Sequence, residues 1–210
     1  METCLILRYR TNERTMFTGI IEAMGQVQAI REEGTNKHFT ISAPFTNELQ
    51  VDQSVAHNGI CLTVIDISGT SYTVTAIDET LQKTNLNSLQ VGNKINLERC
   101  MSANGRFDGH IVQGHVDQVA VCESVEDQNG SWVFTFRYDP TLGNVTVEKG
   151  SITVNGISLT VVNSQEDRFS VAIIPYTFEH TNLHQVQPGS TVNLEFDIIG
   201  KYVARLLGKA

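Results

Sequence analysis

The chain has 210 residues, of which 40% are hydrophobic and 18% are charged. This composition supports a packed core in one large domain or two small ones, and it excludes wholesale disorder. The formal net charge of −8 argues against nucleic acid as the main partner, because binding to its backbone requires clustered positive charge. No apolar run approaches the roughly 20 residues that cross a bilayer, and the four cysteines form no metal-ligand spacing. We expect a soluble, cytoplasmic protein with free thiols and no membrane or nucleic-acid partner.

Residues 1–15 precede the first patterned segment. Their apolar stretch, residues 4–7, is too short for a signal-peptide core, and no small-residue cleavage site follows it. We expect a disordered extension, or an upstream start codon that precedes the true start at Met16. Three arginines in this stretch leave an organelle-targeting leader as the alternative.

An internal repeat organises the rest of the chain. Three blocks recur at one offset of 97 residues (151 − 54): Ser54–Val64 with Ser151–Val161, Thr80–Leu86 with Thr177–Leu183, and Gly92–Glu98 with Gly189–Glu195. The first pair is identical at seven of eleven positions. Earlier in each half, Ile20–Glu22 aligns with Ile111–Gln113 at an offset of 91 (111 − 20). The constant register predicts a tandem duplication, with an N-terminal domain at 16–104 and a C-terminal domain at 105–197.

Both halves have the pattern of β-structure. Segments rich in β-branched and aromatic residues are separated by Gly, Asn, Asp and Ser turns, as at 39–43, 72–77, 132–136 and 169–173. Such short strands favour a barrel over a sandwich, because closure removes the exposed edges of so small a sheet. One helical turn is predicted at 78–83 with Asp78 as its N-cap, and its repeat partner is predicted near 176–180. Residues 101–105 are the predicted linker.

The last stretch changes to a helical period. Residues 198, 199, 202, 203, 206 and 207 are apolar and fall on one helical face, while Lys201 and Arg205 lie on the other. A lone helix of this length is marginal in water, so its apolar face must pack against something. We expect residues 198–210 to pack against other copies of the chain in an oligomer, with packing onto their own barrel as the alternative.

The duplication itself has a chemical consequence. Two similar barrels offer two similar pockets, which suits a reaction between two identical molecules; the alternative is that duplication only enlarged a stable scaffold. The mismatched positions are Cys61 opposite Ser158, His57 opposite Val154, and His115 opposite residues 23–24. A thiol and an imidazole in one half alone would make the pockets unequal, so that one bound molecule acts as donor and the other as acceptor.

Six segments, in order, carry the motifs of one enzyme family: 16–22, Ser54–Val64, 109–117, Ser151–Val161, 174–183 and 193–202. Through them the chain resembles the riboflavin synthase family from Met16 onward. The resemblance implies two tandem homologous six-stranded Greek-key β-barrels plus a C-terminal α-helix that holds a homotrimer. It also implies a transferase that dismutates two molecules of 6,7-dimethyl-8-ribityllumazine to riboflavin and 5-amino-6-(ribitylamino)uracil, without cofactor or metal.

The resemblance further implies where the substrates bind, between the N-terminal barrel of one subunit and the C-terminal barrel of a neighbour. The N-terminal pocket would use Gly19, Ile20, Ile21, Cys61, Leu62, Thr63, Thr75, Ala76, Ile77, Asp78, Glu79 and Thr80. The C-terminal pocket would use Gly114, His115, Val116, Ser158, Leu159, Thr160, Ala172, Ile173, Ile174, Pro175, Tyr176 and Thr177. Lys149 would reach a ligand across the interface, Phe17 would lie near the reacting centre, and lumazine synthase is a candidate partner protein.

The chemistry falls, by the same resemblance, to Ser54, Cys61, His115, Ser158 and Asp197. An imidazole with a pKa of about 6.5 can take a proton from the acidic C7 methyl group of the acceptor. The donor needs a nucleophile, either water held by hydroxyls or the Cys61 thiol. Each residue also has a structural interpretation: Cys61 as a core thiol, Ser54 and Ser158 as strand-end hydrogen-bonding groups, and Asp197 as a helix cap. We expect His110 to be structural.

The main alternative function is a non-catalytic lumazine- or flavin-binding protein of the same fold. Such a protein would hold a single chromophore and lack the reactive side chains. The presence of Cys61, His115 and Ser158 favours the enzyme. A barrel that binds single-stranded nucleic acid is disfavoured by the negative charge and the single Trp.

Overall fold

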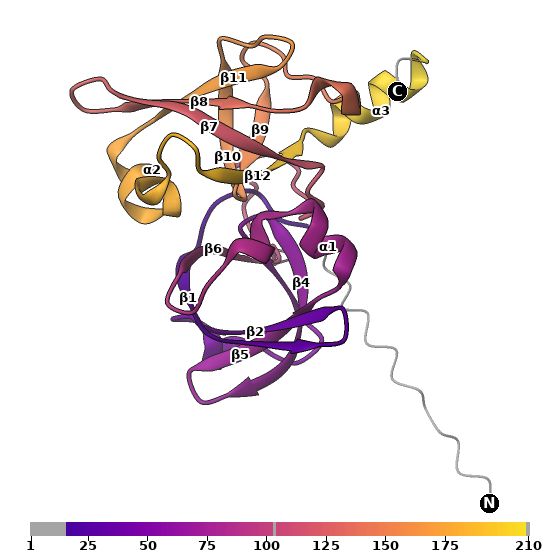
Figure 1. Cartoon of the computed structure of the whole chain (residues 1–210), viewed down its shortest axis with the longest axis vertical. Coiled ribbons are helices and arrows are strands. Elements are labelled where there is room, and N and C mark those ends of the chain that lie inside the picture. The colour runs from indigo at the N-terminus through magenta and orange to yellow at the C-terminus, as the bar shows by residue number, and fades with distance from the viewer. Residues whose placement is uncertain (1–15, 103, 209–210) are drawn as a thin grey trace, which may run out of the picture.

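Two stacked β-barrels form the body of the chain (Figure 1). The computed structural model describes residues 16–102 and 104–208, so the predictions made for residues 1–15 lie outside the described residues. Each barrel is closed and consists of six antiparallel strands. The predicted fold class, two barrels followed by a C-terminal helix, is confirmed.

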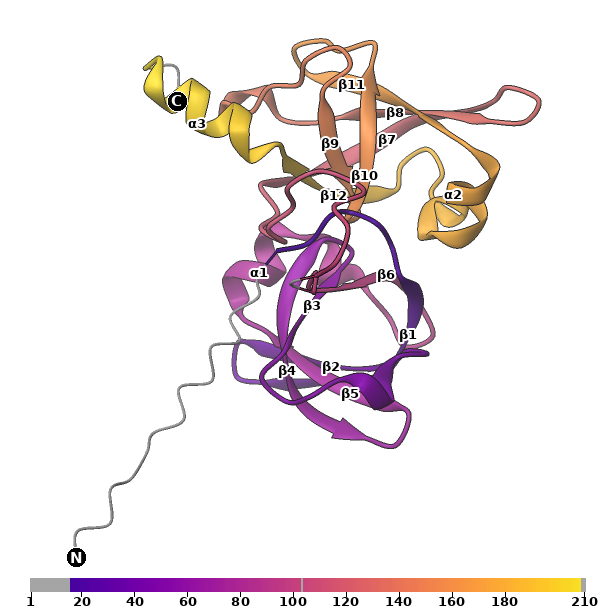
Figure 2. The ribbon, with the colours of Figure 1, turned by 180° about the vertical axis from the view of Figure 1, so that it is seen from behind.

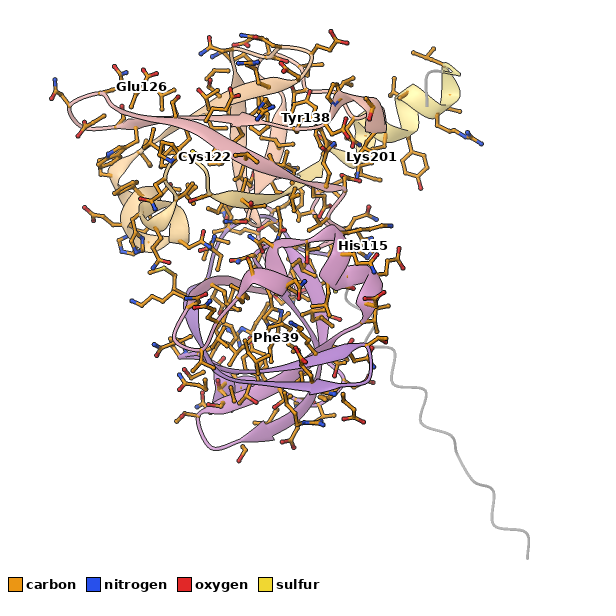
Figure 3. The ribbon with its side chains drawn as sticks, in the orientation of Figure 1. Phe39, His115, Cys122, Glu126, Tyr138 and Lys201 are labelled. Atoms are coloured by element: carbon orange, nitrogen blue, oxygen red, sulfur yellow. The ribbon has the colours of Figure 1, made fainter. Side chains whose placement is uncertain are left out.

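The N-terminal barrel has the cyclic strand order β1-β2-β5-β4-β3-β6. Its strands are β1 (Ala23–Glu33), β2 (Asn36–Ser42), β3 (Ser54–His57), β4 (Ile60–Ser68), β5 (Ser71–Ala76) and β6 (Lys94–Arg99). Alternate side chains fill the interior, as Tyr72, Val74 and Ala76 of β5 do. Phe39 lies among them inside this barrel (Figure 3). The predicted strands at 39–43 and 72–77 are therefore present.

The C-terminal barrel repeats this order as β7-β8-β11-β10-β9-β12. Its strands are β7 (Gln118–Asp127), β8 (Trp132–Arg137), β9 (Ser151–Val154), β10 (Ile157–Val162), β11 (Arg168–Ile173) and β12 (Thr191–Phe196). Its core is more aromatic than that of the first barrel, with Phe134, Phe136 and Phe169 fully buried. The same topology in both halves confirms the tandem duplication.

One short helix follows the fifth strand of each barrel: α1 (Asp78–Lys83) and α2 (Pro175–His180). Four 3₁₀ turns complete the connections: η1 (Thr46–Glu48), η2 (Asn85–Ser88), η3 (Pro140–Leu142) and η4 (Asn182–Gln185). The prediction of Asp78 as the N-cap of α1 is wrong, because Ile77 occupies the cap position in an extended conformation. The Asp78 carboxylate instead accepts a hydrogen bond of 2.7 Å from Gln82.

The C-terminal helix α3 (Ile198–Leu206) projects away from its barrel, as both ribbon views show (Figures 1 and 2). Asp197 caps it by accepting a 2.9 Å bond from the Ile199 amide, which confirms the predicted cap. None of its residues is buried, and Leu206 is 85% exposed. The alternative in which the apolar face packs onto its own barrel is therefore wrong. Within residues 16–102 and 104–208, no helix is long and apolar enough to span a membrane.

A pseudo-twofold axis relates the two barrels. The residues that it makes equivalent correct the predicted alignment of the first segments of the two halves. Gly19 and Gly114 have matching φ angles of 78° and 77°, and each carbonyl accepts a 2.8 Å bond from the opposite barrel. The starts of the halves therefore align at an offset of 95 (114 − 19), and the predicted offset of 91 is wrong. His115 lies opposite Ile20 rather than residues 23–24. The apolar pairs Ile20–Ile21 and Ile111–Val112 can be aligned at more than one offset, whereas the left-handed glycines Gly19 and Gly114 allow only one alignment.

A cluster of six asparagines joins the barrels. Its members are Asn58, Asn85 and Asn96 from the first half and their repeat partners Asn155, Asn182 and Asn193, each no more than 9% exposed. The Asn96 side-chain amide donates to the Asn155 carbonyl at 3.0 Å, and the Asn193 amide donates symmetrically to the Asn58 carbonyl at 2.9 Å. A buried polar group without a partner costs free energy, so this reciprocal pairing fixes how the barrels meet.

One polar pair distinguishes the two cores. His57 Nε2 lies 2.8 Å from the Tyr72 hydroxyl inside the N-terminal barrel, whereas the equivalent residues of the second barrel are the apolar Val154 and Phe169. Burial lowers the pKa of His57 to about 4. The imidazole is thus neutral in the folded state, and the mismatch predicted at His57 is a feature of the core rather than of a pocket.

This pair predicts an acid-sensitive stability. The unfolded chain binds a proton on His57 below pH about 6.5, which the folded barrel resists down to about pH 4. The free energy of unfolding therefore has its full value above pH ~6.5 and decreases as the pH falls toward ~4, because only the unfolded chain gains a proton on His57 in this range. The double variant His57→Val, Tyr72→Phe, which copies the second barrel, should reduce this loss by up to about 3 kcal/mol in urea unfolding between these pH values. Tyr72→Phe alone should keep the loss, and an unchanged pH slope in the double variant would contradict this account.

Candidate active site

Each barrel has a stretch where two neighbouring strands separate. In the N-terminal barrel, β4 and β5 pair from Val64 with Val74 outward, so Cys61–Thr63 face no partner in β5. Those residues pair only with β3 on their other side. On β5, Thr75 and Ala76 pair only with β2. We call this opening, between Cys61–Thr63 and Thr75–Ile77, the N-terminal strand gap.

The C-terminal barrel opens at the equivalent place. β10 and β11 pair only at Val161 with Val171 and at Val162 with Ser170. Ser158–Thr160 and Ala172–Ile174 therefore border a second opening, the C-terminal strand gap. Unpaired strand edges present peptide N–H and C=O groups, which can bind the polar edge of a flat heterocycle by strand-like hydrogen bonds. The predicted binding segments from β4, β5, β10 and β11 thus lie at two matching openings.

The side chains that border the gaps lie on the outer wall of each barrel. Leu62 points into the core, so its neighbours Cys61 and Thr63 point outward. The β3–β4 register pairs Ser54 with Thr63, which puts Ser54 diagonally across from Cys61 on the same face. The predicted residues Ser54 and Cys61 are therefore neighbours. Phe17, in contrast, is fully buried and packs beside Cys61 rather than facing solvent.

Two segments cross between the barrels and bring residues of one half beside the strand gap of the other. The crossing segment 17–21 reaches the C-terminal barrel, where the Gly19 carbonyl accepts a 2.8 Å bond from the Ser158 amide. The crossing segment 112–116 reaches the N-terminal barrel, where the Gly114 carbonyl accepts a 2.8 Å bond from the Cys61 amide. The packing of Ile21 and Val116 follows the same exchange. Within one protomer Gly19 thus lies beside Ser158 and Gly114 beside Cys61. The pockets implied by the resemblance, which group Gly19–Ile21 with Cys61 and Gly114–Val116 with Ser158, stay a prediction.

A buried carboxylate holds each crossing segment. Glu195 accepts bonds of 2.7 to 3.0 Å from the amides of Gln113, Gly114 and His115. Glu98 accepts equivalent bonds of 2.7 and 2.9 Å from the amides of Thr18 and Gly19. Burial raises the pKa of both carboxyl groups, and the amide bonds oppose that shift. These two residues were not predicted, yet they fix the backbone beside both gaps.

The two histidines near the linker have different settings. His115 is exposed and lies at the level where the barrels meet (Figure 3). Its backbone is fixed by Glu195 next to Gly114, so the imidazole stands beside the N-terminal strand gap. His110 is 9% exposed, and its Nδ1 lies 2.7 Å from Ser158 Oγ. A histidine expected to be structural thus contacts a predicted catalytic hydroxyl.

Burial also decides the state of the thiols. It raises the pKa of Cys61, and it raises the pKa of Cys100 to about 12. Both thiols are therefore protonated at neutral pH. Cys61, Cys100 and Cys122 are free thiols in the described part of the chain. A protonated Cys61 is a poor nucleophile, which favours water over the thiol as the group that activates the donor.

Two further predicted residues border cavities at equivalent ends of the barrels. Ser54 lines a cavity of about 430 Å³ with Arg99 and Cys100. Asp197 lines a cavity of about 620 Å³ between the C-terminal barrel and α3. The Lys149 side chain is exposed and forms an ion pair of 3.8 Å with its neighbour Glu148. The predicted reach of Lys149 to a ligand across a subunit interface stays a prediction.

The remaining predicted binding residues divide by exposure. Those open to solvent are Ile20, Thr63, Ile77, Asp78, Glu79, Thr160, Ala172, Ile174, Pro175 and Tyr176; those half-buried are Thr75, Thr80, Val116, Leu159 and Thr177. Asp78 and Glu79 bond to side chains of their own helix. Among the described residues, no group of His, Cys, Asp or Glu has the arrangement of a metal site.

Comparison with known proteins agrees with this geometry. The family model "Lumazine binding domain" matches residues 18–100 and again residues 113–197. Curated riboflavin synthases match nearly the whole chain. The one from Bacillus subtilis is 43% identical over 93% of this chain and 91% of its own length, and the one from Mycobacterium tuberculosis is 41% identical over 93% and 100%.

The chain belongs to the riboflavin synthase family.

Solved structures give the same fold. LumP complexed with 6,7-dimethyl-8-(1'-D-ribityl) lumazine superposes with a TM-score of 0.77 at 24% identity, covering 86% of this chain and 99% of that one. LumP complexed with riboflavin superposes with a TM-score of 0.79 at 25% identity over the same shares. The double barrel of the riboflavin synthase family is therefore also used by a protein of another name, and the fold alone does not decide between catalysis and binding.

The close packing of the crossing segment makes Gly114 a critical residue. A Cβ at Gly114 would lie 2.6 Å from the Cβ of Cys61, and its φ of +77° disfavours other residues. Gly114→Ala should lower the free energy of unfolding by about 1–3 kcal/mol more than Gly69→Ala, whose φ is +58° but whose surroundings are open. Both variants share the backbone strain, so urea unfolding isolates the collision. Equal losses would show that the crossing segment is free to move.

Proposed function

We infer that this protein is a riboflavin synthase, which converts two molecules of 6,7-dimethyl-8-ribityllumazine into riboflavin and 5-amino-6-(ribitylamino)uracil. The curated relatives support this activity. The observation that carries it is the pair of matching strand gaps with unequal side chains, Cys61 and His115 at one and Ser158 at the other. Two equivalent openings suit two identical substrates, and the mismatches give those substrates different roles.

We propose that His115 acts as the base at the N-terminal strand gap. Its backbone is fixed through Glu195, while its imidazole is exposed and free to meet a ligand. An imidazole placed within reach of the acidic C7 methyl group can take a proton from it as a general base. The lumazine whose methyl group loses a proton would be the acceptor of the four-carbon unit.

We propose that the other lumazine is activated by water rather than by the Cys61 thiolate. The thiol stays protonated because it is buried, so its contribution is contact with the ring and a weak hydrogen bond. Holding two rings face to face would supply much of the acceleration, because two bound reactants need no further loss of translational freedom. Ser54, Ser158 and Asp197 would orient water and the ribityl hydroxyls.

We propose that the complete site requires a trimer. The exposed apolar face of α3, which includes Tyr202, Val203 and Leu206, needs a covering surface that its own barrel does not provide. A neighbouring subunit would cover it and bring an N-terminal gap opposite a C-terminal gap. Free thiols on the described strands support a reducing, cytoplasmic location, and lumazine synthase is the proposed partner as supplier of the substrate.

The first test is the role of Cys61. Cys61→Ala should fold and bind the lumazine with an affinity within about threefold of the wild type, while kcat for riboflavin formation falls at least about tenfold. Cys100→Ala removes the neighbouring thiol outside the gap and serves as the matched control. Absorbance of riboflavin measures turnover. Wild-type kcat in Cys61→Ala would show the thiol to be a bystander, and a wild-type protein that binds lumazine without turnover would favour a chromophore carrier.

The second test is the trimer. Leu206→Glu places a charge on the apolar face of α3, whereas Arg205→Glu places the same charge on the polar face of the same helix. We expect Leu206→Glu, and likewise removal of the residues after Asp197, to give monomers with little activity because a charged group in a dry interface is costly. Arg205→Glu should stay trimeric. Sedimentation velocity separates these results; an intact trimer without the helix would refute the assignment.

A further inference from the structure

The unexpected contact of the site is the one between His110 and Ser158. His110 belongs to the connection between β6 and β7, and its Nδ1 lies 2.7 Å from Ser158 Oγ. Ser158 is half-buried on the part of β10 that pairs with β9 but not with β11, where it borders the C-terminal strand gap. The contact therefore joins a buried imidazole to a hydroxyl that a bound molecule can reach.

Backbone contacts with residues 18–19 fix the positions of both His110 and Ser158. The His110 amide donates to the Thr18 carbonyl at 3.1 Å. A Cβ at Gly109 would lie only 1.9 Å from the same carbonyl oxygen, so the chain passes Thr18 where only glycine fits. The Ser158 amide, in turn, donates to Gly19 at 2.8 Å. Both partners of the contact are thus fixed by their backbones rather than by flexible side chains.

The charge state of His110 suits it to accept a hydrogen bond. Burial lowers its pKa, and the nearby carboxylate of Asp197 opposes that shift. A neutral imidazole has one nitrogen with a lone pair and one with a proton. If Nδ1 accepts the Ser158 hydroxyl proton, both lone pairs of Ser158 Oγ remain available to accept hydrogen bonds.

We infer that His110 is a positioning residue, which orients the Ser158 hydroxyl as a hydrogen-bond acceptor for the reacting lumazine and its water in the C-terminal strand gap. This inference rests on the proposed function. It contrasts with the His57–Tyr72 contact, whose two members are both enclosed in a core and can meet no ligand. No bond forms or breaks at His110; its effect reaches the substrate only through Ser158.

The geometry of histidine allows a selective test. The side-chain amide of Asn places a polar atom where Nδ1 of His lies, whereas that of Gln reaches the position of Nε2. We expect His110→Asn to keep kcat within about threefold of the wild type. His110→Gln and His110→Ala should lose at least about tenfold in kcat, comparable to one hydrogen bond. Lumazine affinity, measured by fluorescence titration, should stay within about twofold in all three, and His184→Ala serves as an exposed-histidine control.

A double-mutant cycle links the effect to Ser158. Once Ser158 is replaced by Ala, adding His110→Ala should change kcat no further, because the hydroxyl to be oriented is gone. Equal kcat values in the Asn and Gln variants, or additive losses in the cycle, would overturn the inference. If the wild type itself forms no riboflavin, the proposed function fails instead, so the two failures are distinguishable.

A measurement on the unmodified side chain covers the case in which His110 variants do not fold. Imidazole ¹⁵N chemical shifts of the wild type should show His110 as the neutral tautomer with its proton on Nε2 and an acceptor Nδ1. In Ser158→Ala the Nδ1 signal should move toward the value of a free lone pair, while the other histidine signals stay in place. A proton found on Nδ1, or a signal unaffected by Ser158→Ala, would refute the stated orientation.

Discussion

The reciprocal exchange of segments between the barrels is the constraint on which the site depends. In each half the stretch before the first strand contacts the other barrel, while Glu98 or Glu195 of its own barrel holds it by amide bonds of 2.7 to 3.0 Å. The six-asparagine cluster fixes the angle at which the barrels meet. Because the carboxylates are buried and fully engaged, moving a crossing segment would leave a charge unpaired, which is costly. The walls of both strand gaps are therefore built from both halves.

This exchange explains how the duplicated barrels can keep a symmetric backbone while the side chains at their two strand gaps differ. The framework residues are alike in the two halves, including the glycines, the asparagines and the clamping glutamates. Differences are confined to side chains that reach the gaps or the cores, such as Cys61 opposite Ser158 and His57 opposite Val154. Since framework and difference lie at separate positions, a substitution at a gap can alter chemistry while the barrel contacts stay in register.

Much of the fold followed from the sequence because strands and helices leave local patterns. The alternation in 72–77, the three repeat blocks and the apolar stripe of α3 each correspond to a structural element. The contacts of residues 17–21 and 112–116 with the opposite barrel could not be predicted, because the periodicity of a sequence segment does not show which barrel the segment packs against. A signal was present: Glu98 and Glu195 are charged residues at equivalent ends of apolar strands, and the interface asparagines are identical at the offset of 97. Polar residues kept in both halves indicate shared buried bonding rather than separate chemistry.

The site residues divide by the same reasoning. Cys61 and Ser158 could be singled out because they differ within a matched block. His110 could not, because its importance comes from a contact across 48 positions of sequence with a hydroxyl held by a third segment. Residue type alone is a weak guide to role, as three histidines show. His57 is buried in a core, His110 contacts the Ser158 hydroxyl, and His115 is exposed and is the proposed base. Burial and backbone fixation set these roles, and both arise only when the two halves are folded against each other.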